Sequence, residues 1–97
     1  MPRPRKRRRI AGPGRGPDPA VYKPAGVPLD GLCRVTLPAE ALEALRLADL
    51  EDLTQEEAAA AMAISRSTFQ RLLAQAHRQV AQALVRGCAL VIGGDEQ

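Results

Sequence analysis

Aromatic residues are scarce in this sequence of 97 residues, which contains one Tyr, one Phe and no Trp. Its apolar side chains are mostly those of Ala, Leu and Val, which suit packed helices better than a large sheet. Proline and glycine are concentrated in the first third of the chain, which leaves about sixty residues to build a core. The sequence therefore predicts one small domain that is mainly α-helical.

Long apolar runs are also absent. No run reaches the length of about eighteen residues that a membrane-spanning helix requires. The N-terminus is charged and is not followed by the apolar stretch of a secretory signal. We therefore expect a cytoplasmic protein that has no membrane partner.

The residues that bind metals and carry catalysis are few. The single histidine, His77, and the two cysteines, Cys33 and Cys88, lie far apart in sequence, which argues against zinc or another metal. A bridge between the cysteines is one alternative, but a reducing cytoplasm favours free thiols, so we expect each to act as a small buried apolar residue. His77 is expected on the surface of a helix.

Features of an enzyme are missing as well. The sequence shows no paired carboxylates in a pocket-like context, no nucleophile with a neighbouring base and no glycine-rich phosphate loop. We therefore expect no catalytic residues, no cofactor and no enzymatic activity.

Positive charge is concentrated at the N-terminus. Residues 1–23 contain eight basic residues and one acidic residue, whereas residues 24–97 contain six basic and ten acidic residues. Because its composition cannot bury a core, the segment 1–19 is predicted to be a disordered arm. Flexible basic segments bind phosphates or enter a minor groove, although RNA would attract this arm as well as DNA, and a solvated tail without a partner would have a similar composition. The basic residues predicted to contact nucleic acid are Arg3, Arg5, Lys6, Arg7, Arg8 and Arg9.

The domain is predicted to span residues 20–97 and to contain three helices, at about 38–48, 55–62 and 66–86. Pro38 suits the first turn of the first helix. Thr54 and Glu57 have the spacing of a capping box at the start of the second helix, and Ser65 offers a cap for the third. Gly87 is expected to end the third helix.

Short strands are expected near both ends of this domain. Residues 32–37, LCRVTL, are compatible with a strand, whereas residues 88–92, CALVI, suit either a strand or a docked tail. The second segment has two conceivable pairing partners, at residues 21–23 and 33–37.

The second and third helices together have the pattern of a helix-turn-helix, in which small and apolar residues recur where two helices cross. Ala63 lies in the turn at the position where glycine is most common, although a positive φ there disfavours alanine. The residues expected at the contact between the helices are Ala58, Ala59, Met62, Ile64, Phe69 and Leu72. The apolar period of the third helix runs through Phe69, Leu72, Leu73, Ala76, Val80, Ala83 and Leu84.

The outward side of the third helix is predicted to contact DNA. Arginine binds guanine with two hydrogen bonds, glutamine binds adenine, and hydroxyl groups reach phosphates or bases. The helix contains four arginines and no acidic residue, whereas the preceding segments are acidic. The predicted contact residues are Ser65, Arg66, Ser67, Thr68, Gln70, Arg71, Gln75 and Arg78. A plain three-helix packing module with an incidental basic face is the alternative interpretation.

Four stretches of the chain resemble a known family in order and spacing, namely RPRKRRRI, YKPAGVPL, EALRLADLEDLTQEEAAAAMAISRSTFQRLLAQAHRQVAQAL and GCALVIGG. They resemble the bacterial and archaeal family of small predicted DNA-binding proteins known as domain of unknown function 134. The third stretch is also similar to region 4 of sigma factors. The resemblance implies a helix-turn-helix fold, in which the recognition helix begins with Ser65, Arg66, Ser67, Thr68 and Arg71. It also marks Lys23–Gly26, KPAG, as a family signature.

These observations predict a sequence-specific DNA-binding protein of transcription control that forms a homodimer, because one short helix makes few base contacts. Two alternatives stay open. The first is a non-specific binder of RNA or nucleoid DNA, and the second is a sigma-like adaptor that binds RNA polymerase.

Overall fold

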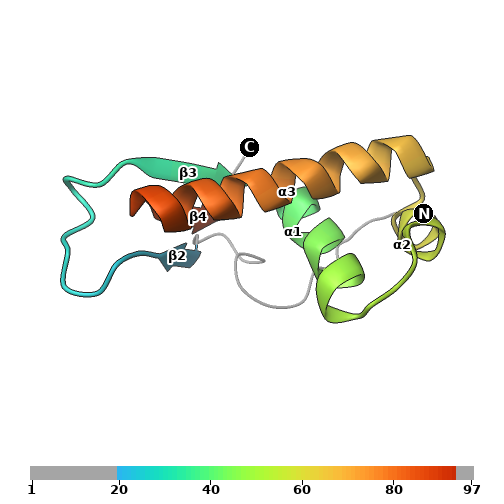
Figure 1. The fold of residues 1–97 in the computed structure, drawn as a ribbon, viewed down its shortest axis with the longest axis horizontal. Coiled ribbons are helices and arrows are strands. Elements are labelled where there is room, and N and C mark those ends of the chain that lie inside the picture. Colours follow the sequence, from blue (N-terminus) through green and yellow to red (C-terminus); the bar gives the residue numbers. More distant parts are fainter. Residues whose placement is uncertain (1–19, 94–97) are drawn as a thin grey trace.

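One long helix, α3 (Arg66–Arg86), spans most of the length of the molecule (Figure 1). The computed structural model describes residues 20–93, so the predicted arm at residues 1–19 lies outside the described residues. The other elements are β2 (Ala20–Tyr22), β3 (Arg34–Leu37), α1 (Ala39–Leu45), the π-helix η1 (Arg46–Leu50), α2 (Gln55–Met62) and β4 (Ala89–Ile92). The described chain is mainly helical, as predicted, and also contains a small sheet.

The sheet has three strands in the order β2-β4-β3, with β4 in the centre. β4 runs antiparallel to β2, where Val21 pairs with Val91, and parallel to β3, where Val35 pairs with Leu90. Residues 88–92 therefore contain a strand and not merely a docked tail. Both conceivable partners of this strand pair with it, one on each side.

Two apolar clusters hold the elements against α3. The first, called the sheet cluster, joins the sheet to α1 and to the C-terminal half of α3. The second, called the turn cluster, joins α1, η1 and α2 to the N-terminal half of α3 around the fully buried Phe69. The buried members of the sheet cluster are Val35, Leu37, Ala41, Ala76, Ala83, Cys88, Leu90 and Ile92, and those of the turn cluster are Ala44, Leu47, Ala58, Ala59 and Phe69.

Side-chain caps begin α2 and α3 at the predicted residues. The Glu57 amide donates to Thr54 Oγ1 at 3.1 Å, and the Thr54 amide donates to Glu57 Oε1 at 2.9 Å, which completes the capping box. At the start of α3, the Thr68 amide donates to Ser65 Oγ at 3.1 Å. These bonds satisfy amides that have no partner within a helix, so both helix starts are set by local sequence.

The ends of α2 and α3 share one backbone arrangement. Ala63 and Gly87 follow these helices in the left-handed conformation, with φ of 58° and 71°. The next amides, of Ile64 and Cys88, donate back to the carbonyls of Ala59 and Ala83 at 3.1 and 3.0 Å. At α2 the Ala63 amide also donates to the Ala60 carbonyl, which completes the Schellman pattern. Both helices end where they were predicted to end.

The first predicted helix differs from the structure at both ends. Pro38 precedes the helix as its cap residue, and α1 ends at Leu45 rather than at residue 48. The chain then widens into η1, where the Glu51 amide donates to the Arg46 carbonyl at 2.9 Å. This wide turn continues the helical path through Asp49 and Leu50, which the sequence had predicted to lie in the loop between the first and second helices.

Leu84 is a second difference from the prediction, because its side chain is 77% exposed. The buried residues of α3, namely Phe69, Ala76 and Ala83, are spaced by seven residues. Leu84 is one position further along, about 100° around the helix from Ala83, and therefore points away from the sheet cluster.

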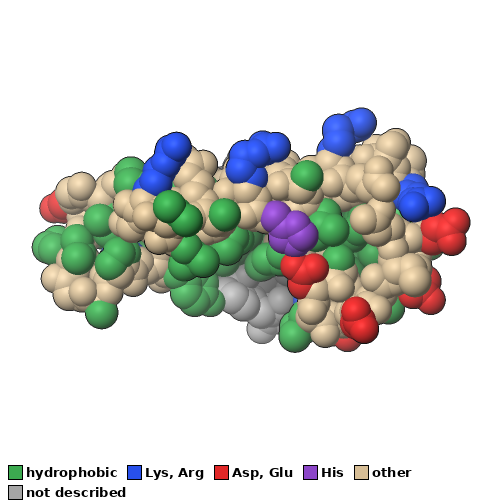
Figure 2. Space-filling view, in the orientation of Figure 1, with side chains coloured by type: hydrophobic (Ala, Val, Ile, Leu, Met, Phe, Trp, Pro, Cys, Tyr) green, Lys and Arg blue, Asp and Glu red, His purple; other side chains and the backbone are tan. Residues whose placement is uncertain are grey.

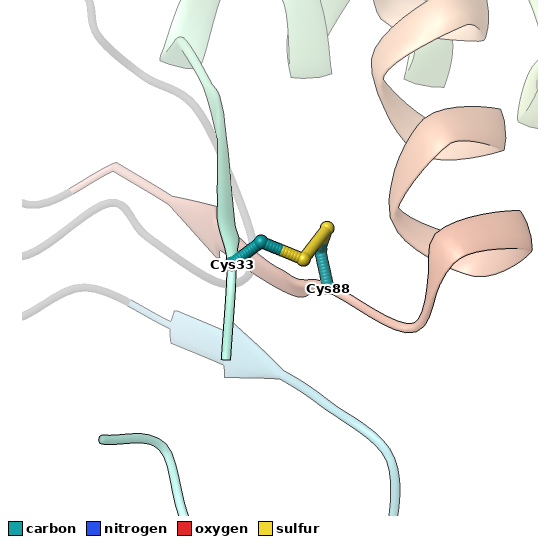
Figure 3. The surroundings of a disulfide bond; sticks show 2 residues. All are labelled: Cys33 and Cys88. Carbon is teal, nitrogen blue, oxygen red and sulfur yellow. A yellow bond between two sulfur atoms is a disulfide. The ribbon is translucent and has the colours of Figure 1, made fainter. Parts of the chain in front are cut away.

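The cysteines also differ from the prediction, because Cys33 and Cys88 form a disulfide bond with a Cα–Cα distance of 4.7 Å (Figure 3). The Cys88 amide donates to the Ala83 carbonyl of α3, which fixes Cys88 at the end of the helix. The next amide, of Ala89, donates to the Cys33 carbonyl at 2.8 Å. Pairing of the two segments therefore brings the two sulfur atoms together. The expectation of two separate thiols is wrong for this structure.

The turn between α2 and α3 generates a prediction about stability. Ala63 is exposed and adopts the left-handed conformation, which disfavours every residue with a Cβ atom. Ala63→Gly should raise the free energy of unfolding by about 1 kcal/mol, measured by urea denaturation.

Ala60→Gly provides the matched control, because Ala60 is also exposed but lies inside α2. There the same change should lower stability by about 1 kcal/mol. Equal effects of the two substitutions would contradict the conformational explanation.

The disulfide generates a second prediction about stability. The bonded residues are separated by 55 positions, so chain entropy predicts that reduction lowers the free energy of unfolding by about 4 kcal/mol. Urea denaturation with and without dithiothreitol measures this difference. In the double variant Cys33→Ala/Cys88→Ala, dithiothreitol should have no effect, and a wild-type protein equally indifferent to it would contradict the prediction.

Candidate nucleic-acid interface

The start of α3 is an exposed polar surface that stands on a buried apolar base. Phe69 is fully buried in the turn cluster, together with the small side chains of Ala58 and Ala59 from α2. The small alanines let α2 approach α3 closely, and Met62 and Ile64 at the turn pack against the same cluster. The predicted contact between α2 and α3 is therefore present, and it leaves the opposite face of this part of α3 exposed.

Two of the eight predicted contact residues at Ser65 and along α3 serve mainly to cap the helix. Ser65 Oγ accepts from the Thr68 amide and lies 2.8 Å from Thr68 Oγ1, to which it donates. Thr68 is half-buried. Their hydroxyl groups are thus engaged with each other, and this pair fixes where the helix begins.

The residues beside this cap are exposed. Arg66, Ser67, Gln70 and Arg71 all lie on the surface within the first two turns of α3. Gln70 Nε2 donates to Gln55 Oε1 at 2.7 Å, a bond that links the start of α2 to the start of α3. Arg66 and Arg71 therefore present the strongest hydrogen-bond donors of this surface, and Gln70 contributes to the positioning of the two helices.

Basic side chains continue along α3 beyond its first turns. Figure 2 shows Lys and Arg side chains spaced along the edge of the molecule that α3 forms. Arg78 is exposed and lies seven residues after Arg71, about 10 Å along the same side of the helix. Gln75 between them is half-buried. Arg86, in the last turn, is also exposed and was not among the predicted contacts. Its presence in the arginine-rich, acid-free sequence of α3 could have identified it as a further basic residue of this edge.

Acidic residues gather on η1 and α2, and at the α2 end of the molecule they come close to the basic edge (Figure 2). In Figure 2 the Asp and Glu side chains lie mainly over the part of the molecule formed by η1 and α2. Among the described residues, the salt bridges involve Arg46 and His77 and none of the arginines of α3. Because no acidic residue within residues 20–93 forms a salt bridge with them, those arginines are available to an external anion.

Arg46 belongs to the acidic side and not to the basic edge. Its guanidinium contacts Glu43 at 2.7 Å and Glu51 at 3.3 Å. The hydrogen bond with Glu43 is the main cause that raises the pKa of Arg46. Because two carboxylates already neutralise this charge, Arg46 is a poor candidate for binding phosphate.

His77 connects the two sides, since its Nε2 lies 2.7 Å from Asp49 Oδ2 of η1. Both side chains are exposed, as was predicted for His77. The contact joins the middle of α3 to the π-helix, and because both side chains are exposed it contributes little to stability.

Other kinds of site find no support in the described part of the chain. Residues 20–93 contain no group of three or more His, Cys, Asp or Glu side chains that is arranged to hold a metal ion. No helix among them is long and apolar enough to cross a membrane. The basic residues predicted in the arm, from Arg3 to Arg9, lie outside the described residues.

Comparison with known proteins identifies relatives over the whole chain. A family model described as "Protein of unknown function DUF134" matches residues 1–97. UPF0251 proteins of Pelotomaculum thermopropionicum and Rhodospirillum rubrum are 48% and 52% identical to it, each over 97% of this chain. The chain spans 69% and 64% of the lengths of these two relatives. A UPF0251 protein of Shewanella sediminis is 45% identical over 100% of this chain and 98% of its own length.

No solved structure matches the chain significantly. The match to the family model and the relatives agree with the resemblance that the sequence motifs carry. The chain therefore belongs to the family of proteins of unknown function called DUF134, whose members bear the name UPF0251.

Proposed function

We propose that this protein is a sequence-specific, non-enzymatic DNA-binding protein of transcription control, in which the first turns of α3 enter the major groove. The observation that carries this proposal is the exposed start of α3, where Arg66, Ser67 and Arg71 lie on the surface of a helix that contains no acidic residue. A surface helix that serves only solubility usually mixes charges of both signs. The segregation of charge favours an anionic partner.

The geometry of the helix pair supports the major groove as the binding place. In a helix-turn-helix, the N-terminal residues of the second helix contact base edges while the first helix crosses the backbone. Here α2 packs on α3 through its alanines, and the cap at Ser65 places Arg66 and Ser67 in the first turn. Arginine and hydroxyl side chains at these positions suit direct base contacts and phosphate contacts.

The basic edge of α3 and the arm would add affinity without adding specificity. Arg78 and Arg86 are exposed further along α3 and suit contacts with phosphates. The six basic residues from Arg3 to Arg9 would neutralise further phosphates or enter the minor groove. We further propose that the protein acts in the cytoplasm as a homodimer, since a single short recognition helix reads few base pairs.

A sigma-like adaptor that binds RNA polymerase is the second candidate function. It is favoured by Leu50, which is 75% exposed on η1 between the acidic residues Asp49 and Glu51. An interface is marked by a contiguous apolar patch, whereas a single exposed leucine is common on protein surfaces, so this observation favours the adaptor less strongly than the basic face of α3 favours DNA. Selection of bound fragments from random DNA distinguishes the two, because an adaptor alone enriches no sequence motif and a dimeric regulator enriches a symmetric one.

Substitutions in α3 test the proposed base contacts. Arg66→Ala and Arg71→Ala should each weaken binding to the selected sequence by about 5- to 150-fold, because a good bidentate contact discriminates by about 1–3 kcal/mol. Binding to random DNA should fall much less, so the specificity ratio falls. Competition titrations with selected and random duplexes measure this ratio.

Arg86→Ala is the matched control, since it removes the same charge about 30 Å from Arg66 along the same helix. It should leave the specificity ratio unchanged. The proposal fails if random DNA and random RNA bind equally well and Arg66→Ala affects neither.

Removal of the arm tests its electrostatic role. A chain that lacks residues 1–9 should bind all DNA sequences more weakly, and the slope of log K against log[salt] should become shallower by up to about five. Replacement of the six basic residues by alanine keeps the length of the chain and should give the same result. An unchanged slope would show that the arm does not contact the phosphates.

A further inference from the structure

The disulfide between Cys33 and Cys88 joins two segments that the helix-turn-helix separates. Cys33 lies directly before β3, and Cys88 lies between the end of α3 and β4 (Figure 3). Cys88 follows Cys33 by 55 positions, and the chain between them includes β3, α1, η1, α2 and α3. The bond therefore encloses the whole helical part of the domain in one covalent loop.

The two sulfur-bearing residues have very different surroundings. Cys88 is only 5% exposed and belongs to the sheet cluster, where it packs among residues such as Val35 and Leu90. Cys33, in contrast, is an exposed residue at the edge of the domain. A thiol in solution therefore approaches the bond more readily from the Cys33 side than from the Cys88 side.

Backbone hydrogen bonds hold the two residues together independently of the disulfide. The Ala89 amide donates to the Cys33 carbonyl at 2.8 Å, and the parallel pairing of β3 with β4 begins directly beside the cysteines, where Arg34 pairs with Ala89. These bonds need no covalent link between the sulfur atoms. After reduction they keep the two thiols adjacent, which makes renewed closure an intramolecular reaction at high effective concentration.

We propose that Cys33 is a thiol-exchange site for low-molecular-weight thiols of the glutathione type and that Cys88 is its resolving cysteine. The proposal is independent of DNA binding. It explains why a domain expected in a reducing compartment contains a disulfide, because such bonds in cytosolic proteins are usually transient or redox-sensing.

The exchange proceeds in two balanced steps. An external thiolate attacks Cys33 Sγ, a mixed disulfide forms, and the electron pair of the broken bond leaves on Cys88 Sγ, which takes up a proton. A second thiolate attacks the external sulfur of the mixed disulfide, which releases the Cys33 thiolate and the oxidised external disulfide. In the reverse direction, the Cys33 thiolate attacks the external disulfide, and the Cys88 thiolate then displaces the bound thiol from Cys33.

The consequence of exchange is a change in stability at one end of the domain. Reduction removes the covalent link between the end of α3 and β3, so the sheet cluster loses its tether. Arg66 and Arg71 lie about 25 Å or more from Cys88 along the helix. The redox state should therefore shift the unfolding transition while leaving the exposed start of α3 unaltered.

Single-cysteine variants of the full chain test the asymmetry. Cys88→Ser leaves Cys33 alone, and Cys33→Ser leaves Cys88 alone. Oxidised glutathione should form a mixed disulfide with Cys33 about tenfold or more faster than with Cys88 in the folded proteins, because a buried thiol is shielded from the reagent. Intact-mass spectrometry after an acid quench measures both rates.

The same variants in concentrated urea are the control, since unfolding should make the two rates similar. Equal rates in the folded proteins would overturn the proposal. If either variant fails to fold, the wild-type protein is treated with limiting reduced glutathione, quenched and digested. An adduct on Cys33 supports the proposal, whereas an adduct on Cys88, or reduction no faster than global unfolding, overturns it.

Discussion

Burial of one side of α3 is the constraint on which the rest of the structure depends. Phe69, Ala76 and Ala83 form a line of buried residues along this helix. Phe69 belongs to the turn cluster, whereas Ala76 and Ala83 belong to the sheet cluster. A single continuous helix thereby joins two small cores, neither of which contains many large side chains, and its outward face is left for polar and basic residues.

The alanines on this line explain how so few aromatic residues suffice. Small side chains let α1 and α2 approach α3 closely, so the space between the helices is filled without large rings. Phe69 and Leu37 are the large side chains that are fully buried, one in each cluster. Loss of either would leave a cavity that the surrounding alanines cannot fill.

Features set by neighbouring residues were predictable from the sequence. The capping box at Thr54 and Glu57, the cap at Ser65 and the end at Gly87 each depend on contacts within a few residues. The bounds of α2 and α3 were therefore predicted correctly. The exposed arginines of α3 were predictable for the same reason, because helical spacing from the buried Phe69 determines their direction.

Features set by distant residues were not predictable in the same way. The sheet requires three segments to meet, and only the fold decides that β4 pairs on both edges. The disulfide depends on that pairing, because Cys33 and Cys88 become neighbours only through β3 and β4. The π-helix η1 has the same kind of cause, since tertiary packing overrides an ideal periodicity of 3.6 residues. The exposure of Leu84 depends instead on which side of the regular helix α3 the two clusters cover.

The two ends of α3 carry different chemistry because the helix is unbroken between them. Its 21 residues contain neither glycine nor proline, so the helix has no kink and its two ends are held in a fixed relative position. At its N-terminal end, the Ser65 cap and the turn cluster orient the exposed arginines. At its C-terminal end, Gly87 turns the chain so that Cys88 meets Cys33. The disulfide can thus control how firmly α3 is anchored, while the surface offered to a partner is determined by residues that lie far from it.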